Sequence, residues 1–221
     1  MARLKRPTTT SENPSKKFIG WKSNDKKFSY YDKEKKENTE IELPFKFLFL
    51  EQYHKMSGWN NASDSRIYSN EVYSIGKETL NVKSFKGGEI ANGLYRDVKD
   101  SIKNAGAVYM RSIYIMLESG EIANLELKGS AVAKYSDFYN DNKHLLDNQW
   151  IEVNQAIEGK KGAVKFSTPD FTIGGNITKT QDKTATEVAT ILETYMDSYF
   201  NKDSEPIEAV EEEIIENENP F

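Results

Sequence analysis

Apolar and polar residues alternate with a period of two along much of this chain, which is the pattern of half-buried β-strands. Residues 40–50 read EIELPFKFLFL, so that every second residue from Ile41 to Phe49 is apolar. Pro44 interrupts the run and indicates an edge position or a bulge, because proline cannot donate a ladder hydrogen bond. The same alternation predicts further strands at residues 17–22, 27–31, 80–85, 109–117, 121–128, 149–157 and 163–167.

Three other segments show helical spacing instead. After Thr184, which begins a capping-box pattern, apolar residues recur every three to four positions as far as Tyr199. This spacing predicts an amphipathic helix whose apolar stripe packs on a sheet. Helices are predicted at residues 94–104, 130–139 and 185–200.

Many short strands with a few helices that do not alternate strictly with them indicate a mainly β fold. The pattern favours a small barrel or a sandwich over a doubly wound parallel sheet. We expect a flexible basic arm at residues 1–17, one domain over residues 18–202, and a disordered acidic tail at residues 203–221.

Charge is divided unevenly between the predicted domain and the predicted tail. The chain has 35 Asp+Glu and 30 Lys+Arg, a formal net charge of −5. Eight of the carboxylates lie in the last nineteen residues, which contain no lysine or arginine, so the rest has 27 carboxylates against 30 cations, a formal +3. A nominally acidic chain is therefore a mildly basic body with an acidic appendage.

Several classes of chemistry have little support in the residues present. The chain has no cysteine, and its two histidines, His54 and His144, have neighbours without ligand or triad spacing. The paired glycines lack the lysine of a phosphate-binding loop, and acidic pairs such as Asp97 with Asp100 are common on solvated helix faces. We therefore predict a protein that is not an enzyme and that needs no cofactor or metal.

The chain shows no sign of a membrane segment. No apolar run approaches the roughly 18 to 20 residues that span a bilayer, and the N-terminal residues lack the apolar stretch of a signal peptide. We expect no membrane partner, and we expect the protein to stay in the compartment where it is made.

Basic and aromatic residues are interleaved, which is the combination that single-stranded nucleic acid requires, because cations meet phosphates and rings stack on bases. In residues 80–85, alternation places Leu80 and Val82 on one face and Lys83 with Phe85 on the other. Each ring also fits a place in the core, so both interpretations stay open for it. The residues predicted to bind single-stranded DNA are Trp21, Lys22, Tyr31, Trp59, Arg66, Tyr68, Lys83, Phe85, Lys86 and Arg96.

The acidic tail resembles a known peptide class. It ends in EEEIIENENPF, and an acidic C-terminus that finishes in Phe is similar to those of bacterial and phage single-stranded DNA-binding proteins. The body segments YSNEVYS and LNVKSFKGGEIANGLYRDVK resemble the single-stranded DNA-binding protein of crAss-like and related bacteriophages, over roughly residues 18–171. Asparagines stand where the tail of that class often has aspartates or an apolar residue. The tail residues expected to contact partners are Glu211, Glu212, Glu213, Pro220 and Phe221.

This resemblance implies an OB-like small barrel of about five or more strands with two or three flanking helices. It also implies non-sequence-specific binding of single-stranded DNA, a role in phage replication or recombination in the host cytoplasm, and replication or recombination proteins as partners of the tail. The alternatives are a virion or scaffold protein with an aromatic interface and, second, a metal-dependent nuclease. The oligomeric state, including a homo-oligomer, stays open.

Overall fold

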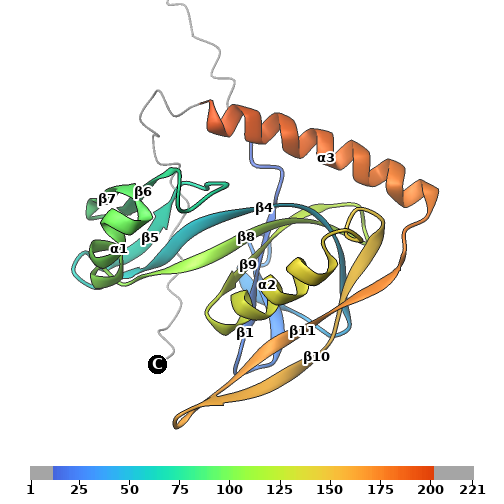
Figure 1. Ribbon diagram of the computed structural model, residues 1–221, viewed down its shortest axis with the longest axis horizontal. Coiled ribbons are helices and arrows are strands. Elements are labelled where there is room, and N and C mark those ends of the chain that lie inside the picture. Colours follow the sequence, from blue (N-terminus) through green and yellow to red (C-terminus); the bar gives the residue numbers. More distant parts are fainter. Residues whose placement is uncertain (1–11, 202–221) are drawn as a thin grey trace, which may run out of the picture.

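The computed structural model describes residues 12–201, and its backbone is dominated by strands (Figure 1). The predicted tail residues and most of the predicted basic arm lie outside this range. The strands are β1 Lys17–Lys22, β2 Lys27–Asp32, β3 Glu37–Ile41, β4 Phe45–Asn60, β5 Ser65–Ser69, β6 Thr79–Ser84, β7 Gly88–Leu94, β8 Ala107–Leu117, β9 Ile122–Lys128, β10 Gln149–Lys161 and β11 Val164–Asn176. The helices are α1 Tyr95–Asn104, α2 Ser130–Asn142 and α3 Lys179–Phe200.

All the strands in residues 12–201 belong to one mixed sheet. Its main path runs β3-β2-β1-β9-β8-β4-β5-β6-β7, and β1 with β9 is a parallel pair whereas the other pairs are antiparallel. The long strand β4 pairs with β8 along one side and divides its other side between two partners. Its start pairs with β10, and its end pairs with β5, so the sheet forks at β4.

The larger branch of the fork curls around the main hydrophobic core. Ile19, Phe47 and Leu125 are fully buried there, and α2 and β11 cover the core from one side. The curl brings Phe28 of β2 against Phe45 of β4, with ring centroids 5.0 Å apart. Because β2 and β4 are separated by three strands in the sheet order, this contact requires strong curvature. The sheet nevertheless stays open within the described residues, since no ladder joins β2 or β3 to β11.

The smaller branch has a core of its own. The end of β4 with β5, β6 and β7 packs against α1 around Ile67, Leu80 and Val82, all fully buried. Ile102 is the buried residue of α1. The alternation predicted for residues 80–85 is confirmed, because Leu80 and Val82 point into this core and Lys83 and Phe85 do not.

Helix α3 packs on the sheet face opposite α2, over residues of β4, β8 and β9. Figure 1 shows it as a long helix along one side of the sheet. Leu192 and Met196 are its buried residues, and they pack on Tyr53 and Tyr114. The helix begins at Lys179, earlier than its apolar spacing predicted, because Thr178 and Gln181 form the capping box. No helix in the described part of the chain is long and apolar enough to cross a membrane.

The predicted fold class is confirmed at the level of a β-rich architecture with three flanking helices. The segment at 40–50 differs from its prediction as one strand, because Pro44, which cannot donate a ladder hydrogen bond, lies between the end of β3 at Ile41 and the start of β4 at Phe45. Strands β10 and β11 are longer than predicted and form one extended hairpin.

Candidate nucleic-acid interface

Strands β4, β5 and β6 bring five of the predicted DNA-binding residues onto one face of the sheet. Trp59 of β4 is directly opposite Arg66 of β5, and Tyr68 of β5 is directly opposite Lys83 of β6. Phe85 follows β6, and its backbone N–H donates to the Arg66 carbonyl over 3.0 Å. Directly opposed residues of paired strands point to the same side, so these side chains share a face. We call these five residues the aromatic patch.

The rings of the aromatic patch are unusually exposed for their size. Trp59 exposes 45% of its surface, and Tyr68 and Phe85 each expose 37%. The residues that alternate with them, such as Ile67 and Val82, are fully buried in the smaller core. Packing therefore accounts for one face of this ribbon and leaves the other, with its three rings, open to solvent.

Two close backbone contacts fix the strand ends that carry the patch. A side chain at Gly58 would place its Cβ 2.3 Å from the carbonyl oxygen of Gly106, so only glycine allows β4 to lie against the α1–β8 turn. Gly106 itself has a φ of 97°, which favours glycine. On the other side, the backbone N–H of Lys86 donates to Ser65 Oγ over 3.1 Å and orders the predicted site residue that follows Phe85.

The same face continues across the sheet as a row of cations. Lys55 of β4 is opposite Met110 of β8, which is opposite Lys128 of β9. Strands β1 and β9 are in register at Gly20 and Glu126, and both run two residues further, to Lys22 and Lys128. The face is open here as well, since a Cβ at Gly20 would meet nothing within 4 Å. Helix α3 covers another part of this face. Lys128 and Lys22 of the row are exposed, whereas the Lys55 side chain is largely buried.

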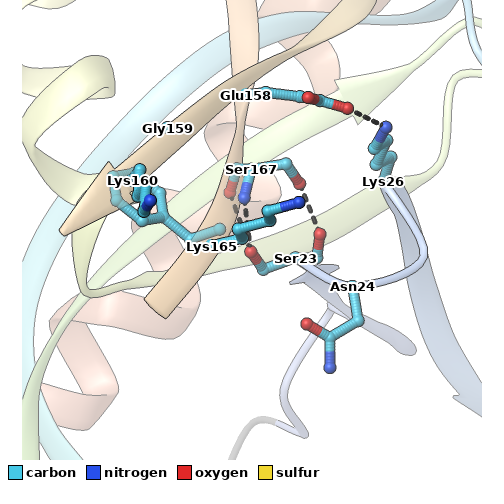
Figure 2. A pocket seen from close by; sticks show the side chains of 9 residues that line it. Ser23, Asn24, Lys26, Glu158, Gly159, Lys160, Lys165 and Ser167 are labelled. Carbon is cyan, nitrogen blue, oxygen red and sulfur yellow. Dashed lines mark hydrogen bonds and ion pairs between the residues drawn. The ribbon is translucent and has the colours of Figure 1, made fainter. Parts of the chain in front are cut away.

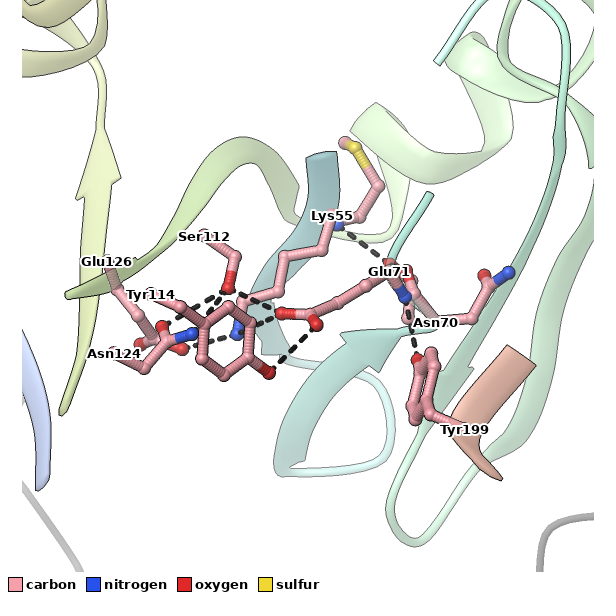
Figure 3. A network of polar contacts seen from close by, with 10 residues as sticks. Lys55, Asn70, Glu71, Ser112, Tyr114, Asn124, Glu126 and Tyr199 are labelled. Atoms are coloured by element: carbon pink, nitrogen blue, oxygen red, sulfur yellow. Dashed lines mark hydrogen bonds and ion pairs between the residues drawn. The ribbon is translucent and has the colours of Figure 1, made fainter. Parts of the chain in front are cut away.

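Lys55 sits in a buried polar network that connects this open face to α3 (Figure 3). Its Nζ lies 2.5 Å from Glu126 Oε1 and 3.9 Å from Glu71 Oε1. Burial opposes its charge, but Glu126 and Glu71 hold the pKa of Lys55 above its usual value. Burial likewise opposes the charge of Glu126, yet Lys55 holds the pKa of that carboxyl below its usual range.

Glu71 is the centre of this network. Its carboxylate accepts hydrogen bonds from Ser112 Oγ and, over 3.0 Å, from Tyr114 Oη (Figure 3). Asn124 Nδ2 donates in turn to Ser112 Oγ over 2.8 Å. The backbone N–H of Glu71 donates to Tyr199 Oη of α3 over 2.7 Å, so the last turn of α3 is bonded to the strand connection beside the patch. A network this well satisfied rigidifies the sheet beneath the open face.

The remaining predicted residues are spread over three places. Lys22 is exposed at the end of β1, on the same face as the cation row, and Tyr31 is half-buried in β2. Trp21 points to the opposite face, where it packs on Phe28 and its Nε1–H donates to the Ser167 carbonyl over 2.9 Å. Arg96 is exposed on α1, behind the smaller core and away from the aromatic patch.

Sequence reasoning missed Lys55 and Lys128. Strand β9 contains no aromatic residue, so the interleaving criterion passes over Lys128, whereas Tyr53 stands two residues before Lys55 and offered the same signal as Lys83 with Phe85. Their place in the cation row comes from the pairing of β4, β8 and β9, which local sequence does not encode. The strict alternation of Glu126 and Lys128 in β9 was the one available signal for an outward-facing pair.

The described residues offer no metal centre. Within 12–201, no three His, Asp or Glu side chains gather closely enough to hold a metal ion. The acidic residues considered for the nuclease alternative, such as Asp97 and Asp100 on α1, lie on the far side of the smaller core from the patch.

Comparison with known proteins finds no match to this chain, either among protein-family models, among curated proteins or among solved structures.

Proposed function

We propose that this chain is a non-sequence-specific single-stranded DNA-binding protein that acts in phage DNA replication or recombination. The observation that carries the proposal is the aromatic patch, in which sheet register gathers Trp59, Tyr68 and Phe85 with Arg66 and Lys83 on one exposed face. Stacking on these rings does not depend on base identity, because every base has a π-face, and the cations meet the phosphates.

The spacing within the patch suits a chain of nucleotides. Adjacent strands lie about 4.8 Å apart, so Trp59 on β4 and Phe85 after β6 are about 10 Å apart across the sheet, with Arg66 between them. A cation between two rings is positioned for the phosphate that links two stacked bases. The cation row then offers the strand a continuation toward Lys128 and Lys22.

At the level of the fold, we propose that the curled branch functions as an OB-like, partly open barrel. Its support is the curvature that brings Phe28 onto Phe45 and the contact of Trp21 with Ser167 of β11. OB-folds likewise bind oligonucleotides on a sheet face and its adjoining loops. We place the protein in the cytoplasm of the bacterial host and assign the acidic tail, including Glu211, Glu212, Glu213, Pro220 and Phe221, to replication or recombination partners.

Titration of the full chain with dT oligonucleotides, followed by tryptophan fluorescence in the absence of divalent metal, tests the proposal. Trp59 is the most exposed tryptophan, so stacking should quench its emission, and raising the salt concentration should weaken binding. A chain that ignores DNA would instead support the interface of a virion or scaffold protein. Strand cleavage that requires Mg²⁺ or Mn²⁺ would support the nuclease alternative.

A further inference from the structure

A basic groove of about 480 Å³ lies between the β1–β2 turn and the β10–β11 hairpin (Figure 2). The turn contributes Asn24 and Lys26, and the hairpin contributes Lys160 and Lys165. These segments are more than 130 residues apart in the chain, as the contact between Lys26 and Glu158 shows. The groove is separate from the aromatic patch, and none of its lysines was among the predicted DNA-binding residues.

The two walls of the groove are fixed to each other. The backbone N–H of Ser167 donates to Ser23 Oγ over 2.7 Å, and Ser167 Oγ donates to the Ser23 carbonyl over 2.5 Å (Figure 2). The bond from Trp21 Nε1 to the Ser167 carbonyl adds a third link. Within the hairpin, a Cβ at position 159 would approach the Phe166 ring to 2.5 Å, so Gly159 lets that ring lie against the backbone. The groove is therefore preorganised.

The charge in the groove is unbalanced. Its one lining carboxylate, Glu158, is hydrogen-bonded to Lys26, which holds the pKa of Glu158 below its usual value. Lys160 and Lys165 are directly opposite each other on the two hairpin strands, and neither forms an ion pair within residues 12–201. Like charges directly opposite each other destabilise a strand pair. An anion placed between these two ammonium groups would remove that repulsion.

We propose that this groove binds the phosphate backbone of single-stranded DNA as an extension of the path across the aromatic patch, an inference that rests on the proposed function. The groove begins where the open face ends in sequence, because Ser23 and Asn24 follow directly on Lys22, which ends β1 on that face. Lys160 and Lys165 contact phosphate oxygens, and the Asn24 amide donates a further hydrogen bond. Free phosphate has the same oxygen chemistry, so the test must separate the two ligands.

The test compares the wild-type chain with the double variant Lys160→Gln/Lys165→Gln by fluorescence anisotropy. Labelled dT oligomers span the roughly 4 to 16 nucleotides that an OB-fold covers. The shortest oligomers, which the aromatic patch holds alone, should bind both proteins equally. For the longest oligomers, the slope of log affinity against log salt concentration should become shallower by about 1.4, because two phosphate contacts are lost. The variant should therefore lose roughly 25-fold more of its affinity at 0.1 M salt than at 1 M salt.

The matched control is Lys99→Gln/Lys103→Gln, which removes the same charge from the exposed side of α1 and should leave the salt slope unchanged. If the groove variant binds every length with the wild-type slope, the inference is wrong while the proposed function stands. The inference also fails if inorganic phosphate at matched ionic strength shifts the amide resonances of the groove but the variant binds DNA normally. A wild-type chain that binds no oligonucleotide would overturn both the proposed function and the inference.

Discussion

Trp59 differs from the other two tryptophans in having no packing role that explains its place. Trp150 is 2% exposed in a hydrophobic cluster, and Trp21 is held by Phe28 and Ser167. Trp59 exposes 45% of its surface opposite Arg66. Trp59 belongs to none of the hydrophobic clusters in the described residues, so we infer a ligand as the reason for this exposed ring beside an exposed cation.

We expect Trp59→Ala and Phe85→Ala each to weaken dT binding by about 1 to 3 kcal/mol, because each removes one stacking surface. The change should be nearly independent of base composition, and anisotropy with dT and mixed-sequence oligomers measures it. Ile191→Ala is the control, since Ile191 is 54% exposed on α3 and outside the patch. Unchanged affinity in both ring variants would remove the aromatic patch from the DNA site, even with the fold intact.

His54 makes a second prediction at the residue scale, because it lies half-buried between two polar neighbours. Its Nδ1 lies 2.6 Å from Tyr109 Oη, and Arg111 Nη1 lies 3.1 Å from its Nε2. Arginine can only donate, so Nε2 accepts and Nδ1–H donates to the tyrosine. Burial, and then the charge of Arg111, lowers the pKa of His54 to about 4.

The unfolded chain takes up a proton on this imidazole near pH 6.5, whereas the folded chain does so only near pH 4. The contribution of neutral His54 to stability is therefore complete above pH 6.5 and is lost as the pH falls toward 4. With allowance for solvent screening, we expect a loss of about 1 to 2 kcal/mol in the free energy of unfolding. Urea denaturation at a series of pH values between 7 and 4 measures it for wild type, His54→Gln and the exposed-site control His144→Gln. If the free energy of unfolding fell equally with pH in all three proteins, the role of His54 would be contradicted.

At the scale of elements, local signals located most strands and helices but not their extent. The bounds of α1 were predicted to within one residue, because the helix and Gly106, the signal that ends it, are neighbours in the sequence. Strand β4 runs to Asn60, well past the predicted end at residue 50, although Glu51, His54 and Lys55 are polar. These polar residues stay in the strand because neighbouring side chains provide them with ion pairs and hydrogen bonds. Glu126 pairs with Lys55, and Tyr109 with Arg111 satisfies His54.

The candidate site was predictable only in part, for the same reason. Alternation along β6 correctly placed Lys83 and Phe85 on the outer face, since that is a property of one strand. The assembly of Trp59, Arg66 and Tyr68 with them depends on the register of β4, β5 and β6, which tertiary pairing sets. Trp21 and Arg96 fit the same local criterion, yet the curl of the sheet and the packing of α1 direct them elsewhere.

At the scale of the whole molecule, the position of α3 relates the acidic tail to the open face. Phe200, in the last turn of α3, stacks on Tyr73 at 5.0 Å and contacts Tyr53 at 5.6 Å. Lys55 lies two residues beyond Tyr53 on the same face of β4. The described chain therefore ends near Lys55 of the cation row, and the eight carboxylates of residues 203–221 follow it in sequence.

We therefore expect the tail to compete with DNA by charge. A chain ending at residue 202 should bind dT more tightly than the full chain at low salt, by about 1 kcal/mol or more, roughly fivefold. The difference should vanish as salt rises, because a Debye length of about 10 Å at 0.1 M falls to about 3 Å at 1 M.

Glu211→Gln/Glu212→Gln/Glu213→Gln should reproduce part of the gain, whereas Phe221→Ala, which keeps the charge, should bind DNA like the full chain. Anisotropy across a salt series measures all four proteins. Equal low-salt affinity of the truncated and full chains would show that the tail leaves the DNA face alone and serves partners only.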